Sequence, residues 1–245
     1  MRLDKFLTEM GIGTRSEVKK ILKAKQVTVN GETVTKPETK VDPDSDVVNC
    51  AGKEITYCKF EYYLFHKPAG CVTATEDTLH KTVMDYLTDT VRSDLFPVGR
   101  LDIDTEGLLL ITNDGALAHE LLSPAKHVPK TYYAVIDGKV TEEDVNHFKS
   151  GVDIGEKNLT KPGILKILKR QPKSKIELTI TEGRFHQVKR MFEAVGKPVL
   201  YLKRISMGPL VLPDDLKSGE YRPLTEEELH LLKQETQKKH SGNQL

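Results

Sequence analysis

The chain contains 245 residues, 38 % hydrophobic and 30 % charged, and its 37 basic and 36 acidic side chains give a formal net charge of +1. This length fits one large domain or a large domain with a small one, and the composition is too polar for a membrane protein. No apolar run approaches the roughly 18 residues of a spanning helix. The first residues also lack the apolar core of a secretory signal, so we expect a cytoplasmic protein.

The first 56 residues are expected to form a small domain of their own. Leu3, Phe6 and Leu7 share one face of a short helix, and residues 14–17 (Thr-Arg-Ser-Glu) form a capping box that begins a second helix. Asn30-Gly31 predicts a type I′ turn, and hence a hairpin over residues 27–34. The second helix exposes a basic face, made by Arg15, Lys19, Lys20 and Lys23.

A linker at residues 57–60 is expected to lead to a larger domain, residues 61–232. Short strands are predicted at residues 62–65, 108–112, 131–136, 164–168 and 176–181. Helices are predicted at residues 82–87, 116–122, 142–149, 186–195 and 226–232. Strands and helices do not alternate strictly, which favours an α+β fold with a mainly antiparallel or mixed sheet. Residues 233–245 are polar and are expected to form a flexible tail.

The cysteines and the charges refine these expectations. Cys50, Cys58 and Cys71 are odd in number and form no CxxC pattern, so we interpret them as small hydrophobic side chains rather than a disulfide framework or a zinc site. Residues 161–204 contain twelve basic and three acidic side chains, a local charge of +9, and the rest of the chain sums to −8. Residues 1–40 carry a further local charge of +4. Basic blocks of this kind are either solvated surfaces or binding sites for a polyanion.

Residues 99–107, Gly-Arg-Leu-Asp-Ile-Asp-Thr-Glu-Gly, place four charged side chains between two apolar segments. Buried charges require partners, so a charged loop folded onto a sheet is expected to form a specific arrangement. Asp102 or Asp104 taken alone would be ordinary turn caps. The pattern of residues 99–107 as a whole is more specific than a single aspartate in a loop.

That pattern, with the Leu-Leu-Leu-Ile-Thr that follows it, resembles the signature loop of the RsuA-type pseudouridine synthases, which modify ribosomal RNA. Residues 130–135 resemble the Lys-x-Tyr strand of that family, and residues 182–191 resemble its third motif. Residues 1–56 are similar to an S4 RNA-binding domain. The resemblance extends to about residue 230 and is greatest to the branch that acts on 16S rRNA of the small subunit.

The resemblance implies roles for individual residues. Asp102 is expected to be the catalytic aspartate, acting as a nucleophile or as a base at the sugar, and Tyr132 is expected to stack on the target uracil. A cation should keep Asp102 ionised; Lys189 stands where many relatives have arginine, and Arg190 is the neighbouring candidate. Arg100 is expected to enter the space left by a flipped base. The remaining expected contacts to substrate and RNA come from Lys130, His186, Gln187, Arg15, Lys19, Lys20 and Lys23.

The resemblance also sets the expected partners. We expect ribosomal RNA as the substrate, either free or within a small-subunit assembly particle, and a monomeric protein. Isomerisation has no net redox change, and no metal or nucleotide motif is present, so we expect no cofactor and no metal. Two alternatives remain open: the same chemistry on 23S rRNA, or a non-catalytic RNA-binding or ribosome-assembly factor.

Overall fold

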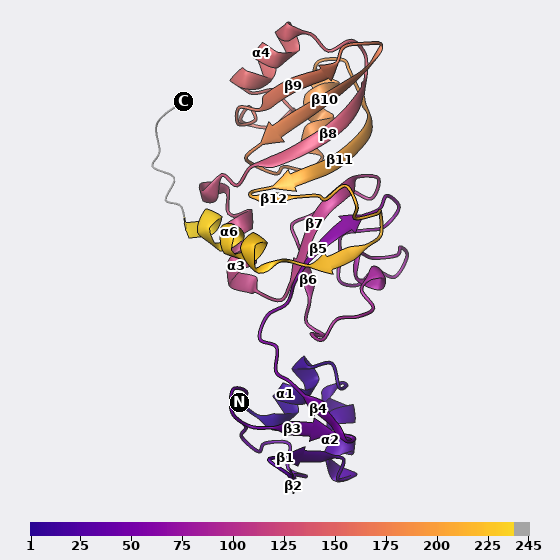
Figure 1. The fold of residues 1–245 in the computed structure, drawn as a ribbon. Coiled ribbons are helices and arrows are strands. Elements are labelled where there is room, and N and C mark those ends of the chain that lie inside the picture. Colours follow the sequence, from indigo (N-terminus) through magenta and orange to yellow (C-terminus); the bar gives the residue numbers. More distant parts are fainter. Residues whose placement is uncertain (238–245) are drawn as a thin grey trace. The chain divides into compact units, whose positions relative to one another are not determined.

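A computed structural model of the chain describes residues 1–237 (Figure 1). The chain forms two compact units: residues 1–61 together with 87–95, and residues 62–86 together with the chain from residue 96 onward. No helix within the described residues is both long and apolar enough to cross a membrane. Each unit has its own hydrophobic core, and the two are described separately below.

The first unit has two helices against a small antiparallel sheet with strand order β2-β1-β3-β4. Its elements are α1 (Leu3–Glu9), α2 (Arg15–Lys23), β1 (Val27–Val29), β2 (Glu32–Thr33), β3 (Val48–Cys50) and β4 (Lys53–Ile55). The predicted capping box is present: Thr14 Oγ1 accepts a hydrogen bond from the Glu17 amide, and Glu17 accepts one from the Thr14 amide. Asn30 and Gly31 both have positive φ angles, 51° and 84°, as a type I′ turn requires.

Residues 87–95 join the first unit through Arg92, which the sequence did not single out. Its buried guanidinium donates to both carboxylate oxygens of Asp94, to Glu9 at 3.2 Å and to the Cys58 carbonyl at 3.2 Å. Burial opposes the charge, but these partners outweigh it and raise the pKa of Arg92. The first unit is therefore built from two separate stretches of sequence.

The second unit contains one mixed sheet of nine strands. Seven follow each other in the order β13-β5-β7-β11-β8-β10-β9, while β6 pairs with β7 and β12 with β11. Among the strands of residues 1–237, only β7 and β11 pair in parallel. The strands are β5 (Tyr62–Lys67), β6 (Phe96–Val98), β7 (Glu106–Thr112), β8 (Lys130–Asp137), β9 (Ile164–Lys169), β10 (Lys173–Ile180), β11 (Val199–Met207), β12 (Leu210–Val211) and β13 (Tyr221–Pro223). This arrangement confirms the expected α+β fold with a mixed sheet.

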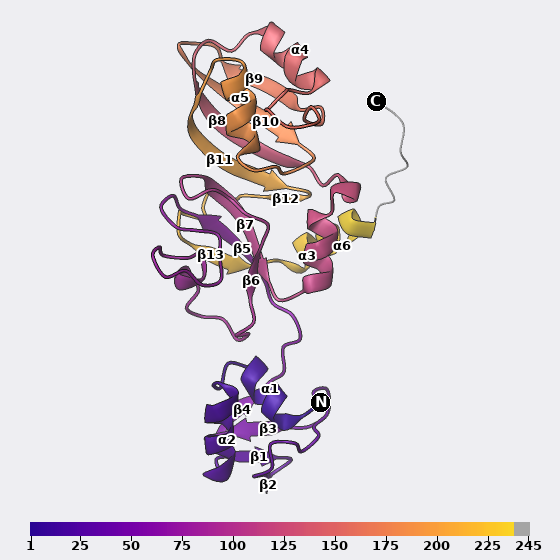
Figure 2. The same cartoon turned by 180° about the vertical axis from the view of Figure 1, so that it is seen from behind.

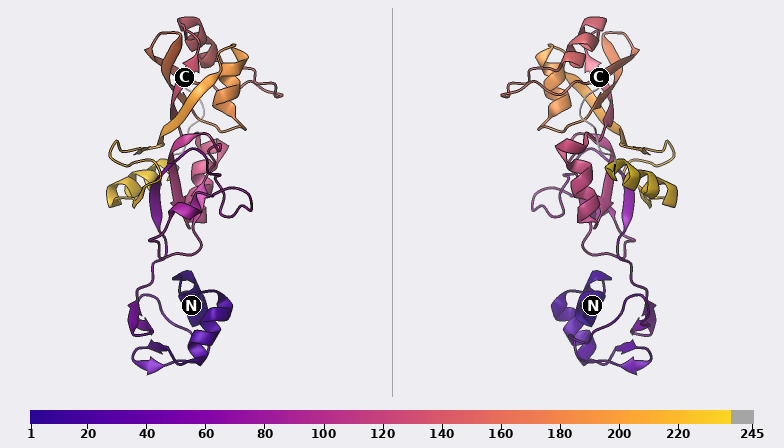
Figure 3. Two further views of the ribbon diagram at one scale, coloured as in Figure 1. Left: turned by 90° about the vertical axis from the view of Figure 1, so that its right-hand side faces the viewer. Right: turned by 90° about the vertical axis from the view of Figure 1, so that its left-hand side faces the viewer.

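Four helices cover this sheet: α3 (Gly115–Leu122), α4 (Glu142–Ser150), α5 (Gln187–Ala194) and α6 (Glu226–Gln237). α4 and α5 pack on the half of the sheet that contains β8 to β11, where the rings of Phe148 and Phe192 are 4.7 Å apart (Figure 2). α3 and α6 contribute Leu121 and Leu232 to a second core that includes strands β5 and β7. Figure 3 shows the helices beside the sheet in side views.

Two predictions about elements were wrong, and one long strand was missed. Residues 82–87 form only a short 3₁₀ turn, Met84–Tyr86, because the Asp85 carboxylate accepts from the Thr82 amide at 2.6 Å and closes one turn. The long strand β11 was not predicted at all. Residues 233–237, expected in a tail, belong to α6, and the rest of that tail, 238–245, lies outside the described residues.

The cysteines partly follow the prediction. Cys50 and Cys71 are buried, whereas Cys58 is only half-buried, and all three are free thiols. Burial raises the pKa of each thiol, which favours the neutral form.

Candidate active site

The charged motif forms the loop between β6 and β7. At its end, Gly107 lies beside Arg204 of β11 with a φ of +109°, and a Cβ atom there would stand 2.2 Å from the Arg204 carbonyl oxygen. Only glycine allows the two backbones to approach so closely. The sequence therefore fixes the loop at the junction of the two parallel strands.

The ammonium group of Lys67, at the end of β5, anchors this loop through hydrogen bonds to its backbone. Lys67 is fully buried and donates hydrogen bonds to the carbonyls of Pro68 (3.0 Å), Asp102 (3.1 Å), Ile103 (3.4 Å) and Thr105 (2.9 Å). Burial lowers the pKa of Lys67. Its contacts converge on the backbone that carries Asp102, so Lys67 positions that backbone.

A second set of hydrogen bonds holds the loop from the segment after β5. The Thr73 hydroxyl donates to the Leu101 carbonyl at 2.8 Å and accepts from the Leu101 amide at 3.1 Å. The Gly70 amide donates to the Ile103 carbonyl at 2.7 Å. The residues on both sides of Asp102 are thus held by backbone contacts, which restrict where its carboxylate can lie.

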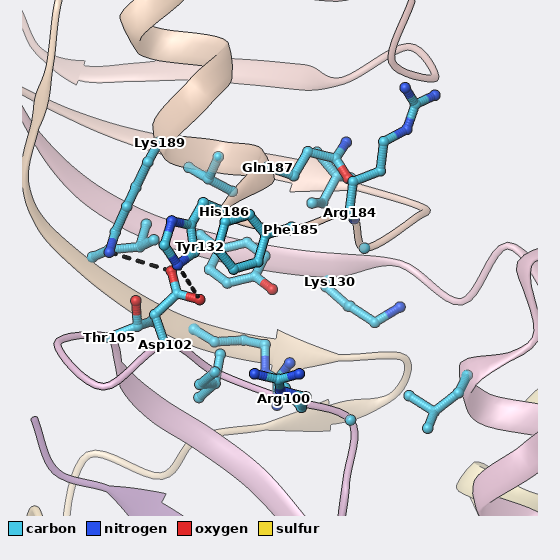
Figure 4. Close-up of a pocket in the computed structure, with 18 residues that line it drawn as sticks. Arg100, Asp102, Thr105, Lys130, Tyr132, Arg184, Phe185, His186, Gln187 and Lys189 are labelled. Atoms are coloured by element: carbon cyan, nitrogen blue, oxygen red, sulfur yellow. Dashed lines mark hydrogen bonds and ion pairs between the residues drawn. The ribbon is translucent and has the colours of Figure 1, made fainter. Parts of the chain in front are cut away.

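The Asp102 carboxylate faces two side chains from the start of α5 (Figure 4). Lys189 Nζ lies 3.2 Å from Asp102 Oδ2, and His186 Nε2 lies 3.5 Å from Oδ1. Lys189 also donates to Asp104 at 2.6 Å. Burial favours the neutral form of Lys189, but Asp104 and Asp102 outweigh it and raise the Lys189 pKa, so the lysine remains charged beside the aspartate.

A cavity of about 490 Å³ opens beside this cluster. Tyr132 on β8, only 8 % exposed, lines it, while Arg100 at its edge is exposed. Seven of the residues predicted from sequence surround this one cavity: Arg100, Asp102, Lys130, Tyr132, His186, Gln187 and Lys189. They come from the loop before β7, from β8 and from the start of α5.

Other predicted residues lie elsewhere or are engaged otherwise. Arg190 is turned toward Glu156, which it contacts at 2.6 Å, and also donates to the Phe185 carbonyl at 3.1 Å, so Lys189 is the cation at Asp102. The Gln187 side chain donates to Glu182 and accepts from the Arg184 amide. The four basic residues of α2, Arg15, Lys19, Lys20 and Lys23, are exposed in the first unit.

The basic stretch at residues 161–204 does not form one open surface. Arg184 and Arg190 pair with Glu156, and Lys197 pairs with Asp144 at 2.6 Å. The lysines that remain exposed on β9 and β10 are Lys166, Lys169, Lys173 and Lys175, and Lys166 contacts Glu177. Part of the local charge of +9 is therefore held in ion pairs with carboxylates of the same unit, and part remains exposed on β9 and β10.

The structure adds three residues to the site that sequence reasoning missed. Lys67 anchors the loop, Phe185 lines the cavity and stacks on His186 with ring centroids 3.8 Å apart, and Arg204 lines the cavity from β11. The sequence offered one signal for Lys67: it is a charged residue two positions after the end of the predicted strand at residues 62–65. Within the described residues, no cluster of three or more histidine, cysteine or acidic side chains could hold a metal ion.

A carboxylate paired with an ammonium group and an aromatic ring thus line one cavity. They lie in a chain that also has a separate small unit. A family model described as RNA pseudouridylate synthase matches residues 61–194, and an S4 domain model matches residues 1–48. The chain therefore belongs to the RNA pseudouridylate synthase family, with an N-terminal S4 domain that binds RNA. It is an isomerase acting on RNA, which confirms the resemblance to pseudouridine synthases.

Named relatives agree with this assignment. The chain is 49 % identical over 234 residues to a Bacillus subtilis (strain 168) protein, "Uncharacterized RNA pseudouridine synthase YtzG", covering 95 % of this chain and 98 % of the relative. It is 41 % identical to "Ribosomal small subunit pseudouridine synthase A" of Escherichia coli (strain K12), covering 94 % and 98 %. A solved structure, "Crystal structure of pseudouridylate synthase", matches with a TM-score of 0.67 and 38 % identity over 95 % of this chain and 99 % of that one.

The anchoring by Lys67 predicts that Lys67→Met lowers both stability and turnover. Buried loop carbonyls would lose their donor, so we expect the free energy of unfolding to fall by about 2–4 kcal/mol and kcat by more than tenfold, with little change in KM. Urea denaturation and steady-state kinetics measure these effects. Lys149→Met removes an exposed lysine and serves as the control, with less than about 0.5 kcal/mol of change. Unchanged stability and kcat in Lys67→Met would contradict the anchoring role.

Proposed function

We propose that this protein isomerises one specific uridine of 16S rRNA to pseudouridine, with Asp102 as the catalytic carboxylate. The supporting observation is the Asp102 carboxylate, held against Lys189 and facing the cavity that Tyr132 lines. The choice of rRNA rests on relatives at 41 % and 43 % identity named as ribosomal small subunit pseudouridine synthases.

The reaction breaks the N1–C1′ bond of uridine, turns the uracil and joins C5 to C1′; the C5 proton leaves and N1 gains a proton, so no atom is gained or lost. Asp102 supports it in one of two ways. As a nucleophile it bonds to C1′ while the bond electrons move to the uracil, and the new C5–C1′ bond displaces it. As a base it takes the proton from C2′ and later returns it.

Both routes require an ionised carboxylate, and Lys189 provides the compensating charge. The ammonium group lies 3.2 Å from Asp102 Oδ2 and is itself held by Asp104. Tyr132 lies on β8 and is only 8 % exposed, and we expect its ring to stack on the uracil while the base turns. Loop, helix and strand thus each contribute one group.

Structured RNA must extrude the target nucleotide before C1′ can reach Asp102. Extrusion costs a few kcal/mol, and stacking on a side chain returns roughly 1–3 kcal/mol. Arg100 is exposed at the cavity edge, two residues from Asp102, and we expect it to enter the gap that the base leaves. Because the two energies are comparable, contacts to the RNA backbone elsewhere must hold the open state.

Those backbone contacts come from the first unit in this proposal. Arg15, Lys19, Lys20 and Lys23 lie exposed on α2, where their charges can bind phosphates without reading sequence. The substrate is free rRNA or a small-subunit assembly particle, and the protein acts as a monomer in the cytoplasm.

Mapping of pseudouridines tests the choice of rRNA. We expect that deleting the gene removes one carbodiimide-reactive site from 16S rRNA and none from 23S rRNA, and that a plasmid copy restores it. Loss of a 23S site would establish the alternative substrate. An unchanged pattern in both rRNAs would contradict the proposal.

The role of α2 predicts a change in salt dependence. In the variant Lys19→Gln/Lys20→Gln/Lys23→Gln we expect weaker RNA binding and a plot of log K against log salt that is shallower by about 0.7–0.9 for each lost phosphate contact. Filter binding at several salt concentrations measures both. Lys149→Gln, a single exposed lysine in the other unit, is the control. An unchanged slope would show that α2 does not contact the RNA backbone.

A further inference from the structure

Two cations lie buried in the cavity wall without a carboxylate partner. Lys130 is 9 % exposed and Arg204 is 2 % exposed. Lys130 donates one hydrogen bond, to the Val128 carbonyl at 3.1 Å, and Arg204 donates one, from Nε to the Leu108 carbonyl at 2.7 Å. Arg204 Nη2 is buried with no partner. Among the residues that the structure describes, neither side chain forms an ion pair.

Such an arrangement is unfavourable for the folded protein by itself. Buried charges carry a large desolvation penalty unless they are paired, and apolar side chains of similar size would pack with less cost. Burial first, and then the neighbouring charge of Arg204, lower the pKa of Lys130 to about 8. An anion placed between them would relieve both the desolvation and the repulsion.

The fold places this pair beside the expected position of the uracil. Arg204 on β11 is directly opposite Tyr132 on β8, and Lys130 precedes Tyr132 by two residues on the same face of that strand. Two residues of strand span about 7 Å. Both cations and Tyr132 line the cavity that contains Asp102. The pair therefore lies within one nucleotide's length of the ring on which the base is proposed to stack.

We propose that Lys130 and Arg204 form a binding site for the phosphate group next to the flipped uridine. The proposal rests on the proposed function, because it takes the cavity to be the uridine site. Before the N1–C1′ bond breaks, uracil and ribose are neutral near pH 7, and phosphate is the one anionic group that an intact nucleotide brings into the cavity. Hydrogen bonds between charged groups are the strongest that the pair can form, and Arg204 has donors to spare.

A site kept for an anion predicts that stability and function change in opposite directions. In Lys130→Met we expect the Tm to rise by several degrees, because an unpaired buried charge is removed, and kcat/KM on rRNA to fall by about 10- to 100-fold. Arg204→Met provides an independent second variant with the same expected pattern. Lys149→Met, which removes an exposed lysine, should alter neither quantity. A lower Tm in both cavity variants would show that the two cations are structural, and would overturn the proposal.

Neutral phosphate analogues test the contact from the RNA side. We would prepare RNA fragments around the mapped uridine with a methylphosphonate either 5′ or 3′ of it, which removes one charge without changing the protein. One of the two positions should reduce kcat/KM of the unaltered protein by at least tenfold, and the same position should reduce that of Lys130→Met by less than threefold. Equal losses in both proteins, or no loss at either position, would overturn the proposal.

Inorganic phosphate separates this proposal from the proposed function. Phosphate should raise the Tm of the unaltered protein in a concentration-dependent way and that of Lys130→Met much less, because a ligand stabilises the state that binds it. If phosphate has this effect but deleting the gene removes no pseudouridine from any rRNA, the result would contradict the proposed function alone. Equal phosphate effects in both proteins, together with a mapped 16S site, would contradict the phosphate site alone.

Discussion

The hydrogen bonds donated by the buried ammonium group of Lys67 hold the loop on which the candidate active site depends. A loop with one basic and three acidic side chains has no intrinsic reason to stay in one conformation. Lys67 gives it one by donating to three of its carbonyls, while Gly107 brings the following strand against β11. Asp102 thereby acquires a fixed position relative to α5 and β8, and the other groups of the site are placed against it.

The positions of the basic side chains explain how a chain with a net charge of only +1 can belong to a family that modifies RNA. Three groups among the basic side chains differ in their surroundings. Those of α2 are exposed in the first unit, several between residues 161 and 204 hold loops through ion pairs, and Lys130 and Arg204 are buried at the cavity without such partners. Net charge sums these groups, whereas an RNA molecule meets each of them separately.

Sequence reasoning succeeded where a local pattern determines structure or chemistry. The capping box before α2, the Asn30-Gly31 turn and the motif around Asp102 were all recognisable, and the structure brings seven expected residues round one cavity. It failed where long-range contacts decide. β11 contains Lys203 and Arg204, which break the apolar pattern of a central strand, and Arg92 joins residues 87–95 to a unit formed mainly by residues 1–61. No local sequence pattern predicts strand β11 or the contact made by Arg92.

Release of the hydrogen at C5 of uridine measures whether the Asp102 carboxylate performs the proposed isomerisation. The substrate would be rRNA from a strain lacking the protein, labelled with tritium at C5 of uridine. We expect the unaltered protein to release tritium, Asp102→Asn to release none above background while still binding RNA, and Asp104→Asn, from the same loop, to retain measurable activity. Tritium release by Asp102→Asn at the rate of the unaltered protein would contradict the catalytic role of Asp102.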